Sequence, residues 1–588
     1  MRGEYEMKKA LLFLCMFFVL LLFAACGGGD ADGTATQNEG TAQEGAATTT
    51  PTTPGGGQVE ASGFDGINWD EHVTFTWWMI GTPPNDYYTS YNDNPVVNYL
   101  EHRFNVTFEF EQAVIGTEAD ALALMMGAGR HTDAIHLQPY PGSITQLYLD
   151  GVIIDIAQWL DYMPNLRNLI ETRPEIARAA FDDDGRILTL PEFNEGTVHP
   201  WSGLVYRHDI LETMTDGNVQ FPSGNDRPTT LADWEYMLPL MLAYFEAAGF
   251  ADFAPLIIPP QGMFHFGELM STFGAYHHFY VRDGIVHAGI LEPAMFEYVS
   301  TMRDWFERGW IHQDFASRTG DMFFMPNPPL VFGGAAGVFY GMTMHLGDRM
   351  SMPDFGMYVD VRPISSPMAA GVTHRDMLRR MEGVYAAATG SAVSSSNPDI
   401  GRFLAVMDHM YHPVYGGRLR TLGLTAEQIP PNDTTMARMG MSEGSYSIDA
   451  NGNAVFHANI DVAGGHIVNT AVSAIRLPGP QAVHYLNAVR SDELANAHAI
   501  WGAHDEETEV HPLPAVLTPT VAEASTLAAN DAHINDLRDQ MLAMFIMGTA
   551  LLTEDTWAEF LDQLRAFGIE ENRAIWQAAY DRYLMRGQ

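Results

Sequence analysis

Strand-like and helix-like patterns of hydrophobic residues alternate between about residue 72 and residue 137. His72–Ile80, Val106–Glu111 and Thr132–Leu137 are dense in β-branched and aromatic side chains, which is typical of strands. Between them, Asn94–Phe104 opens with Asn-Pro and predicts a helix, as does the apolar spacing of Glu118–Met126. This order of elements predicts a parallel α/β sheet, whose ligands would bind where the strands end.

The rest of the chain carries signals for further helices and hairpins. Thr230-Leu-Ala-Asp233 has the form of a capping box and predicts a helix to about Ala248. The predicted hairpins join Phe279–Arg282 to Ile285–His287 through Asp283-Gly284, and Tyr446–Ile448 to Ala454–Ile460 through Asn451-Gly452. The other predicted helices run from Pro293 to near Gly309, over Ile534–Met547, over Thr553–Phe567 and over about Glu571–Tyr583.

The start of the chain predicts secretion. Lys8 and Lys9 precede an apolar run, Ala10–Phe23, which ends in Ala-Ala-Cys26. A basic start, a short apolar core and small residues before the break are typical of a secretory signal, and the run is shorter than the roughly 20 residues of a membrane-spanning helix. Met1 and Met7 both remain possible starts. Cys26 resembles the cysteine of a bacterial lipobox, whose acyl chains would anchor the protein to the membrane, although a signal peptide with an incidental cysteine is the alternative.

The segment after Cys26 predicts a disordered tether, because residues 27–63 contain almost no large apolar side chains. Cys15 lies within the predicted signal, so the mature chain would have no cysteine for a disulfide, a thiolate metal site or a nucleophile. The chain contains 73 acidic and 31 basic residues and has a formal net charge of -42. Such a charge argues against nucleic acid or an anionic membrane surface as a partner.

Several segments of the globular region resemble, in chain order, the extracellular solute-binding proteins of ABC importers, in particular the large Gram-positive lipoprotein branch associated with oligosaccharides. The segments that carry the resemblance are Leu149–Asp155, Asp184–Pro191 with Leu204–Asp209, Pro228–Trp234, Glu297–Phe315, Ser394–Ile400 and Ile534–Tyr580. The sequence departs from the pattern where the family's lysines are Arg or His, and at Trp310 and His312. These departures leave the identity of the ligand open.

The resemblance implies an α/β fold of the two-lobed, type II periplasmic-binding-protein kind, with hinge crossovers and additional C-terminal helices. The expected organisation is a lipoprotein signal at 1–25, a lipidated cysteine and tether at 26–63, and a solute-binding domain at 64–588. Lobe 1 would comprise about 64–195 plus about 383–415, and lobe 2 about 196–382 plus the C-terminal helices. The first crossing would lie between Pro191 and Tyr206, with a return near Gly383–Ala392.

Four segments have the composition of a chemical site but favour simpler interpretations. Gly440–Gly444 matches the GxSxG nucleophile motif, but a hairpin rather than a helix is predicted after it. Asp449–Asn453 lacks the glycine and glutamate that a calcium-binding EF-hand requires. Asp182–Gly185 is expected to be a solvated turn, and His277-His278 lacks partners at metal-binding spacing. A glycosidase pair cannot be selected by counting, since acidic residues are so abundant.

Aromatic and planar polar residues near the predicted strand ends suit a sugar, whose C–H faces stack on rings while its hydroxyls need hydrogen bonds. The resemblance implies that such positions face the cleft, whereas the alternative for each aromatic residue is a place in the core. Side chains alternate along a strand, so Trp77 and Trp78 should point to opposite faces. The candidate ligand-binding residues are Trp78, Gln138, Tyr140, Glu192, Trp201 and Tyr340.

The expected function is reversible capture of an oligosaccharide outside the cell, without catalysis and without a metal or other cofactor. The expected partners are the sugar, the permease subunits of an ABC transporter and, through a palmitoylated or otherwise acylated Cys26, the extracellular face of the cell membrane. The protein is expected to be a monomer. The alternatives are a peptide-binding or other polar-solute-binding lipoprotein, a surface glycoside hydrolase, and a sensor not coupled to transport.

Overall fold

The computed structural model describes most of the chain from residue 66 to residue 587, all of it within the compact unit Gly55–Gln588. The residues left undescribed inside that span are 81–89, 115, 139, 141, 195–201, 265–266, 319–328, 343–358, 370–371, 373–389, 451, 453, 458–476, 482–491, 503–509 and 515. Within the part that is described, no helix is both long enough and apolar enough to cross a membrane.

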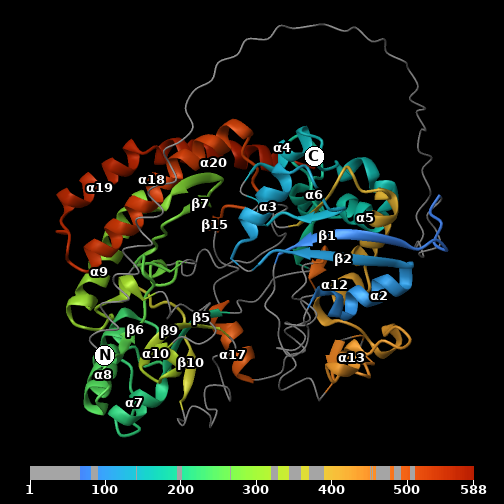
Figure 1. Cartoon of the computed structure of the whole chain (residues 1–588). Helices are drawn as coiled ribbons and strands as arrows, with labels where there is room; N and C mark the ends of the chain where they lie inside the picture. Colours follow the sequence, from blue (N-terminus) through green and yellow to red (C-terminus); the bar gives the residue numbers. More distant parts are fainter. Residues whose placement is uncertain are drawn as a thin grey trace, which may run out of the picture. The chain divides into compact units, whose positions relative to one another are not determined.

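The first sheet has the strand order β11-β3-β1-β2. Its strands β1 and β2 are labelled side by side in Figure 1. Its first three strands in sequence run parallel, and β11 joins β3 in the antiparallel direction. The strands are β1 (Val73–Met79), β2 (Val106–Gln112), β3 (Ala134–His136) and β11 (Ser391–Val393). The predicted parallel α/β unit is therefore confirmed, and β11 adds a strand that arrives from a distant part of the sequence.

Helices cover both faces of this sheet. Helix α2 begins after Asn94, whose side chain accepts hydrogen bonds from the amides of Val96 and Val97 and so caps the first turn. The helices associated with this sheet are α2 (Pro95–Phe104), α3 (Glu118–Gly127), α4 (Ile144–Leu149), α5 (Pro164–Thr172), α6 (Pro174–Ala180) and α11 (Ile400–Asp408). Helices α12 (Gly416–Leu422) and α13 (Thr435–Arg438) and the hairpin of β12 (Tyr446–Ile448) and β13 (Ala454–Phe456) follow α11.

The second sheet has the strand order β10-β5-β9-β6 and mixed strand directions. Helix α8 packs against β6, and its capping box forms as predicted, since Thr230 and Asp233 bond to each other's backbone amides. The strands are β5 (Ser202–Arg207), β6 (Ala254–Leu256), β9 (Ala336–Met342) and β10 (Val361–Pro363). The helices around it are α7 (His208–Met214), α8 (Leu231–Ala248), α9 (Pro293–Glu307), α10 (Pro329–Phe332) and α17 (Asp492–Trp501).

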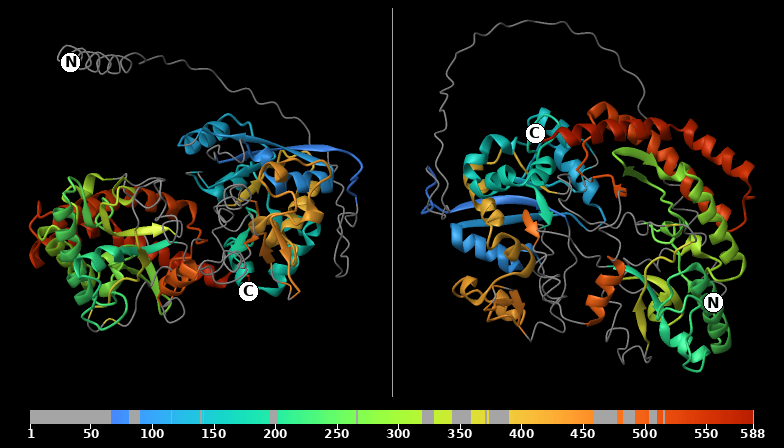
Figure 2. Two further views of the ribbon diagram at one scale, coloured as in Figure 1. Left: turned by 90° about the horizontal axis from the view of Figure 1, so that it is seen from below. Right: turned by 180° about the vertical axis from the view of Figure 1, so that it is seen from behind.

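The C-terminal helices pack against α9 and against a small sheet. Helix α18 contacts α9, and α20 contacts β8 of the small sheet β15-β7-β8 (Figures 1 and 2). These elements are β7 (Phe279–Arg282), β8 (Ile285–Ala288), β15 (Val510–Pro512), α18 (Val521–Ile546), α19 (Glu554–Ala566) and α20 (Ile569–Met585). Helix α18 begins 13 residues before the predicted Ile534, at a capping box formed by Thr520 and Glu523.

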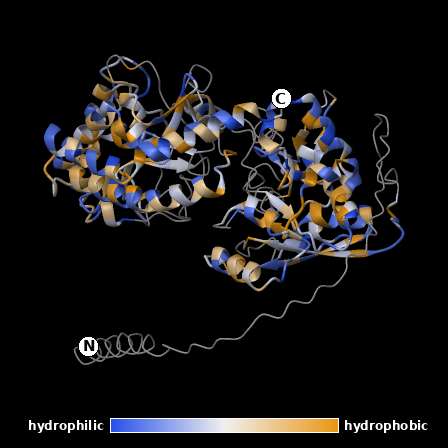
Figure 3. Ribbon diagram, turned by 90° about the horizontal axis from the view of Figure 1, so that it is seen from above, coloured by the Kyte–Doolittle hydropathy of each residue, from blue (hydrophilic) through white to orange (hydrophobic). Residues whose placement is uncertain are grey.

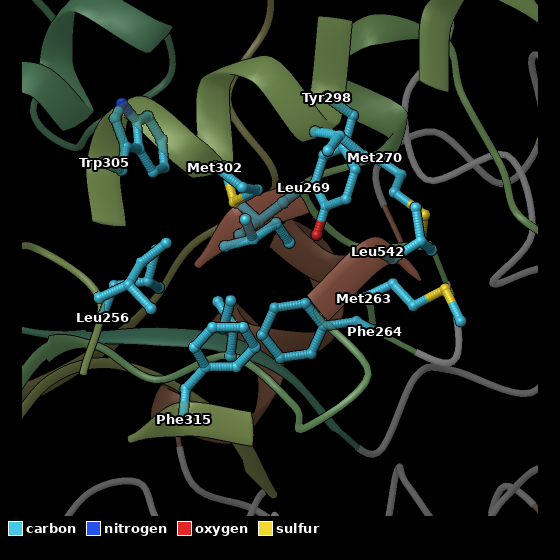
Figure 4. Packing of buried hydrophobic residues seen from close by; sticks show 14 of the residues in the cluster. Leu256, Met263, Phe264, Leu269, Met270, Tyr298, Met302, Trp305, Phe315 and Leu542 are labelled. Atoms are coloured by element: carbon cyan, nitrogen blue, oxygen red, sulfur yellow. The ribbon is translucent and has the colours of Figure 1, made fainter. Parts of the chain in front are cut away.

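Two large hydrophobic cores organise the described residues, here called the first core and the second core. The first core combines side chains from residues 75–193 with others from 393–477. The second core combines residues 204–364 with 534–569, and Figure 4 shows Leu542 of α18 beside Met270 and Tyr298. Most helices alternate between hydrophobic and hydrophilic residues along the ribbon (Figure 3), as helices with one buried face do.

The last turn of α20 is bonded to the segment that leads out of α6. The guanidinium of Arg586 is buried and donates to a carboxylate oxygen of Asp183 at 2.7 Å and to the carbonyl of Val516 at 2.9 Å. Arg582 donates to the other oxygen of Asp183 at 2.6 Å. Because α20 begins at Ile569 in the second core, this one helix is bonded to elements of both cores. The segment Asp182–Gly185, predicted to be a turn, thus also holds the end of the chain.

Candidate ligand-binding site

The carboxyl ends of β1 and β3 lie at one edge of the first sheet, where two predicted residues follow β3. Gln138 is exposed in a turn, and Tyr140 is half-buried beside the small cluster of apolar residues under α3 and α4. A Cβ atom on Gly142 would lie 2.7 Å from the Tyr140 ring, so the glycine makes room for that ring. Burial, and next the charge of Asp150, raise the pKa of the Tyr140 hydroxyl. This edge therefore offers an aromatic ring and a side-chain amide.

Trp77 and Trp78 point to opposite faces of the first sheet, as the alternation predicted. Trp77 lies in the first core and donates from its indole N–H to Ser391 Oγ at 3.2 Å. Trp78 packs on the other face with Leu122 and Ile135, and is 4% exposed. Both rings are buried because helices cover both faces of the sheet. Trp78 is thus placed among apolar neighbours, and its role as a ligand contact stays a prediction.

Glu192 lies at the start of β4 (Glu192–Asn194), which pairs in parallel with β14 (Gly479–Gln481). Its carboxylate accepts a hydrogen bond at 2.5 Å from Arg420 on α12, and both side chains are almost completely buried. The same guanidinium donates to the carbonyl of Gly479 at 2.8 Å. The candidate Glu192 is therefore part of a buried ion pair. Arg420 was not among the predicted residues, because nothing in the sequence links it to Glu192.

Tyr340 lies within β9 of the second sheet rather than at its end, because the strand continues to Met342. Its hydroxyl is 3.1 Å from Ser202 Oγ on β5, and its ring stacks with Phe264 at a centroid distance of 5.8 Å. Ser202 is the first residue of β5 and pairs with Met342, the last residue of β9, so this group lies near the C-terminal end of β9. All three side chains are buried and both rings belong to the second core, so the role of Tyr340 as a ligand contact stays a prediction.

Of the predicted residues, Trp78 and Tyr140 share one apolar cluster next to Gln138, whereas Glu192 pairs with Arg420 and Tyr340 lies apart from them in the second core. Gln138 and Tyr140 follow the same strand of the first sheet, while Tyr340 lies with Ser202 and Phe264 in the second. Trp201 and Cys26 lie outside the described residues. Phe264 and Ser202 were missed, and only their positions next to a strand and a predicted crossing could have suggested them.

The segments considered for chemistry have simple structural roles where they are described. Ser442 is exposed in a turn, and the hairpin β12–β13 follows it, so the strand–turn–helix of a nucleophile elbow is absent there. The carboxylate of Asp182 accepts from the amides of Asp184 and Arg186 and closes its own turn. Among the residues with described positions, no group of three or more His, Cys, Asp or Glu side chains could hold a metal ion.

Comparison with solved structures gives extensive likenesses. The kestose complex of the substrate-binding protein FusA from an S. pneumoniae ABC transporter is 19% identical, with a TM-score of 0.66 over 87% of this chain and 99% of that one. A solute-binding protein for HMO from Bifidobacterium longum infantis, associated with an ABC transporter, is 17% identical, with a TM-score of 0.65 over 87% and 99%. The alginate-binding protein AlgQ2 is 18% identical, with a TM-score of 0.63 over 87% and 98%.

This chain has the fold of a two-lobed solute-binding protein. The predicted fold class is thereby confirmed, whereas the assignment of the first and second cores to its two lobes stays a prediction. No family model matches the sequence. A search of curated proteins found no match either. At these low identities the likeness establishes the fold alone.

Proposed function

We propose that this chain is the extracellular substrate-binding component of an ABC importer and that it captures an oligosaccharide. The observation that carries the proposal is the extent of the structural likeness: it covers 87% of this chain and 98–99% of three proteins named for binding sugars or belonging to sugar transporters. Closure of the two lobes on the sugar would be a population shift towards the state in which both lobes touch it.

The chemistry at the end of β3 supports a sugar as the ligand. The ring of Tyr140 and the amide of Gln138 supply a stacking surface and a planar hydrogen-bonding group at one edge. A sugar ring has apolar C–H faces and a belt of hydroxyls, so both kinds of group are needed.

Thermal unfolding of the protein against oligosaccharides, peptides and polyamines tests the proposal. A ligand that binds only the folded state adds about 2.7 kcal/mol of stability at a hundredfold excess over its dissociation constant. We expect a clear rise in the midpoint with one class of oligosaccharide, and recovery of that sugar intact after long incubation. Cleavage of the sugar would favour a glycoside hydrolase instead. A shift with peptides or polyamines alone would contradict capture of a sugar.

Two tyrosines of the first lobe make a matched pair of variants for that ligand. Tyr140 and Tyr148 are both half-buried against the same apolar cluster, but Tyr148 lies on α4 under the guanidinium of Arg186. We expect Tyr140→Ala to weaken sugar binding at least about tenfold, or about 1.4 kcal/mol, and Tyr148→Ala to leave it unchanged. Isothermal titration measures both. Equal losses in the two variants would contradict a contact between Tyr140 and the sugar.

The anchor is a separate part of the proposal. The run Ala10–Phe23 followed by Ala-Ala-Cys26 supports cleavage before Cys26 and acylation of its thiol, which would hold the protein at the outer face of the cell membrane. Intact-mass analysis of the membrane-extracted protein should give a chain that begins at Cys26 and carries acyl chains. The Cys26→Ser variant should be released into the medium. An unmodified Cys26 in membrane-extracted protein would exclude the anchor.

A further inference from the structure

The chain passes between its two cores directly after β4 and directly after β14. Phe193 of β4 belongs to the first core, and Ser202 already belongs to the second sheet. Leu477, just before β14, is also in the first core, whereas Trp501 of α17 packs against Val205 of β5. β4 and β14 are therefore the last described parts of the first lobe before two crossovers, and they pair with each other in parallel.

One guanidinium holds both of these strands. Arg420 donates to the Glu192 carboxylate on β4 at 2.5 Å and to the Gly479 carbonyl on β14 at 2.8 Å. The Pro191 carbonyl, next to Glu192, accepts from the Gly479 amide at 3.2 Å and from the Tyr411 hydroxyl at 2.8 Å. The Arg420 and Glu192 side chains are only 10% and 4% exposed. An ion pair so withdrawn from water is sensitive to the loss of either partner, because the remaining charge stays buried.

We infer that Arg420 and Glu192 are positioning residues that fix the first-lobe ends of two crossovers in one register, and that Glu192 acts through this pair rather than by touching the ligand. This inference rests on the proposed function, since the register of the crossovers matters only if the lobes close on a ligand. A bidentate guanidinium suits the task because its donors lie in a fixed plane and can bond two strands at once. A lysine at the same place would keep the charge but lose that geometry.

The experiment compares three variants of the pair with one control. The three are Glu192→Gln, Arg420→Gln and the double variant that carries both substitutions, and the control is Arg438→Gln. Arg438 pairs with Asp93 in the same lobe, but the pair is far more exposed and holds no crossover, so this variant is the matched control. With Cys15 and Cys26 replaced by Ser, cysteines introduced at exposed Asn168 and Gln563 carry spin labels, one on each lobe. Pulsed electron paramagnetic resonance then measures the distances between the two labels, with and without the sugar that stabilises the protein in the thermal unfolding experiment.

In each of the two single Gln variants, we expect a broader distribution of interlobe distances in the absence of sugar and an affinity for the sugar that is about tenfold weaker. The reason is that apparent affinity falls with the fraction of molecules able to close. The double variant should be no weaker than either single one, and Arg438→Gln should match the parent protein. Arg420→Lys, which keeps a buried cation, serves if Arg420→Gln does not fold, and should broaden the distances in the same way.

Two results would overturn the inference. If Glu192→Gln weakens binding while both Arg420 variants keep the parental affinity and distances, Glu192 is a ligand contact. If no variant of the pair changes the distances, the pair only stabilises the first lobe. Failure of the parent protein to bind any sugar would refute the proposed function instead, and the distances without ligand would still decide whether the pair positions the crossovers.

Discussion

Replacement of Gly479 by alanine should destabilise the protein through one identifiable collision. Gly479 has a φ of +108°, and a Cβ atom there would lie 2.4 Å from the carbonyl oxygen of Met410. Real Cβ contacts are almost never shorter than 3.0 Å, so one of the two backbones must move by at least 0.6 Å. Neither moves easily: Met410 is fully buried in the first core, and Arg420 and Pro191 bond Gly479 on both sides.

The stability cost of Gly479→Ala has two parts, and the same substitution at a second glycine measures one of them alone. A non-glycine residue at an unfavourable positive φ costs about 1–3 kcal/mol, and forcing an extra methyl group into a packed region costs about 1–3 kcal/mol more. Gly452, in the hairpin turn between β12 and β13, has a φ of +84° but no atom within 4 Å of its Cβ position. Gly479→Ala should therefore cost about 2–6 kcal/mol in the free energy of unfolding, and Gly452→Ala only the first part.

Urea denaturation of both variants, followed by circular dichroism, measures this difference. Hydrogen exchange of peptides that contain residues 189–194 and 477–481 should show that Gly479→Ala loosens the pairing of β4 with β14 and that Gly452→Ala does not. If the two variants lose the same stability to within about 0.5 kcal/mol, the Met410 carbonyl does not constrain Gly479, and the argument from close packing is wrong.

Three further outcomes are expected. Asp183→Ala removes the carboxylate that bonds the end of α20 and should lower the free energy of unfolding by about 3 kcal/mol. Asp562→Ala removes only an exposed ion pair and should lower it by less than about 1 kcal/mol. Urea denaturation of the two variants measures the difference. Burial raises the pKa of Asp408 to about 7, although hydrogen bonds from the amides of Leu166 and Asn165 act to lower it. The stability that protonated Asp408 contributes is therefore complete below about pH 4 and is lost as the pH rises through 7. The free energy of unfolding should fall by up to about 4 kcal/mol between pH 4 and 8, and Asp408→Asn should remove this pH dependence. Because the net charge is -42, raising NaCl from 0.1 to 1 M should raise the thermal midpoint by screening self-repulsion, and a fall would mean that the ion pairs outweigh it.

Local signals predicted much of the fold. Asn94 before α2 and the capping box of Thr230 with Asp233 announced helices that form as expected, because capping depends on residues within one turn. The start of α18 was missed because its first turns are rich in small polar residues and lack an apolar period, although the capping box of Thr520 and Glu523 was present in the sequence. Strand β11 could not be placed by local signals, since its partner β3 lies about 250 residues earlier.

The site was less predictable because it depends on partners that are distant in sequence. Glu192 was selected from the family resemblance, but its bond to Arg420 joins residues 228 positions apart, and no spacing in the sequence indicates it. Alternation predicted that Trp77 and Trp78 face opposite ways, yet it could not tell that helices bury both faces. Tyr340 and Ser202 meet only because β5 and β9 pair in the antiparallel direction.

The division of each core between distant parts of the chain would have a consequence for the export that we propose. A secreted chain emerges with its N-terminus first, and here the first core is incomplete until Leu477 has emerged and the second until Ile569 has. If the chain is exported as proposed, neither core can fold to completion while the chain is still passing through the membrane, and this order of assembly would keep the chain in a form that can be translocated. The cost comes on the outer side, where contacts of such long range form slowly and the apolar segments stay open to aggregation until the last helices arrive.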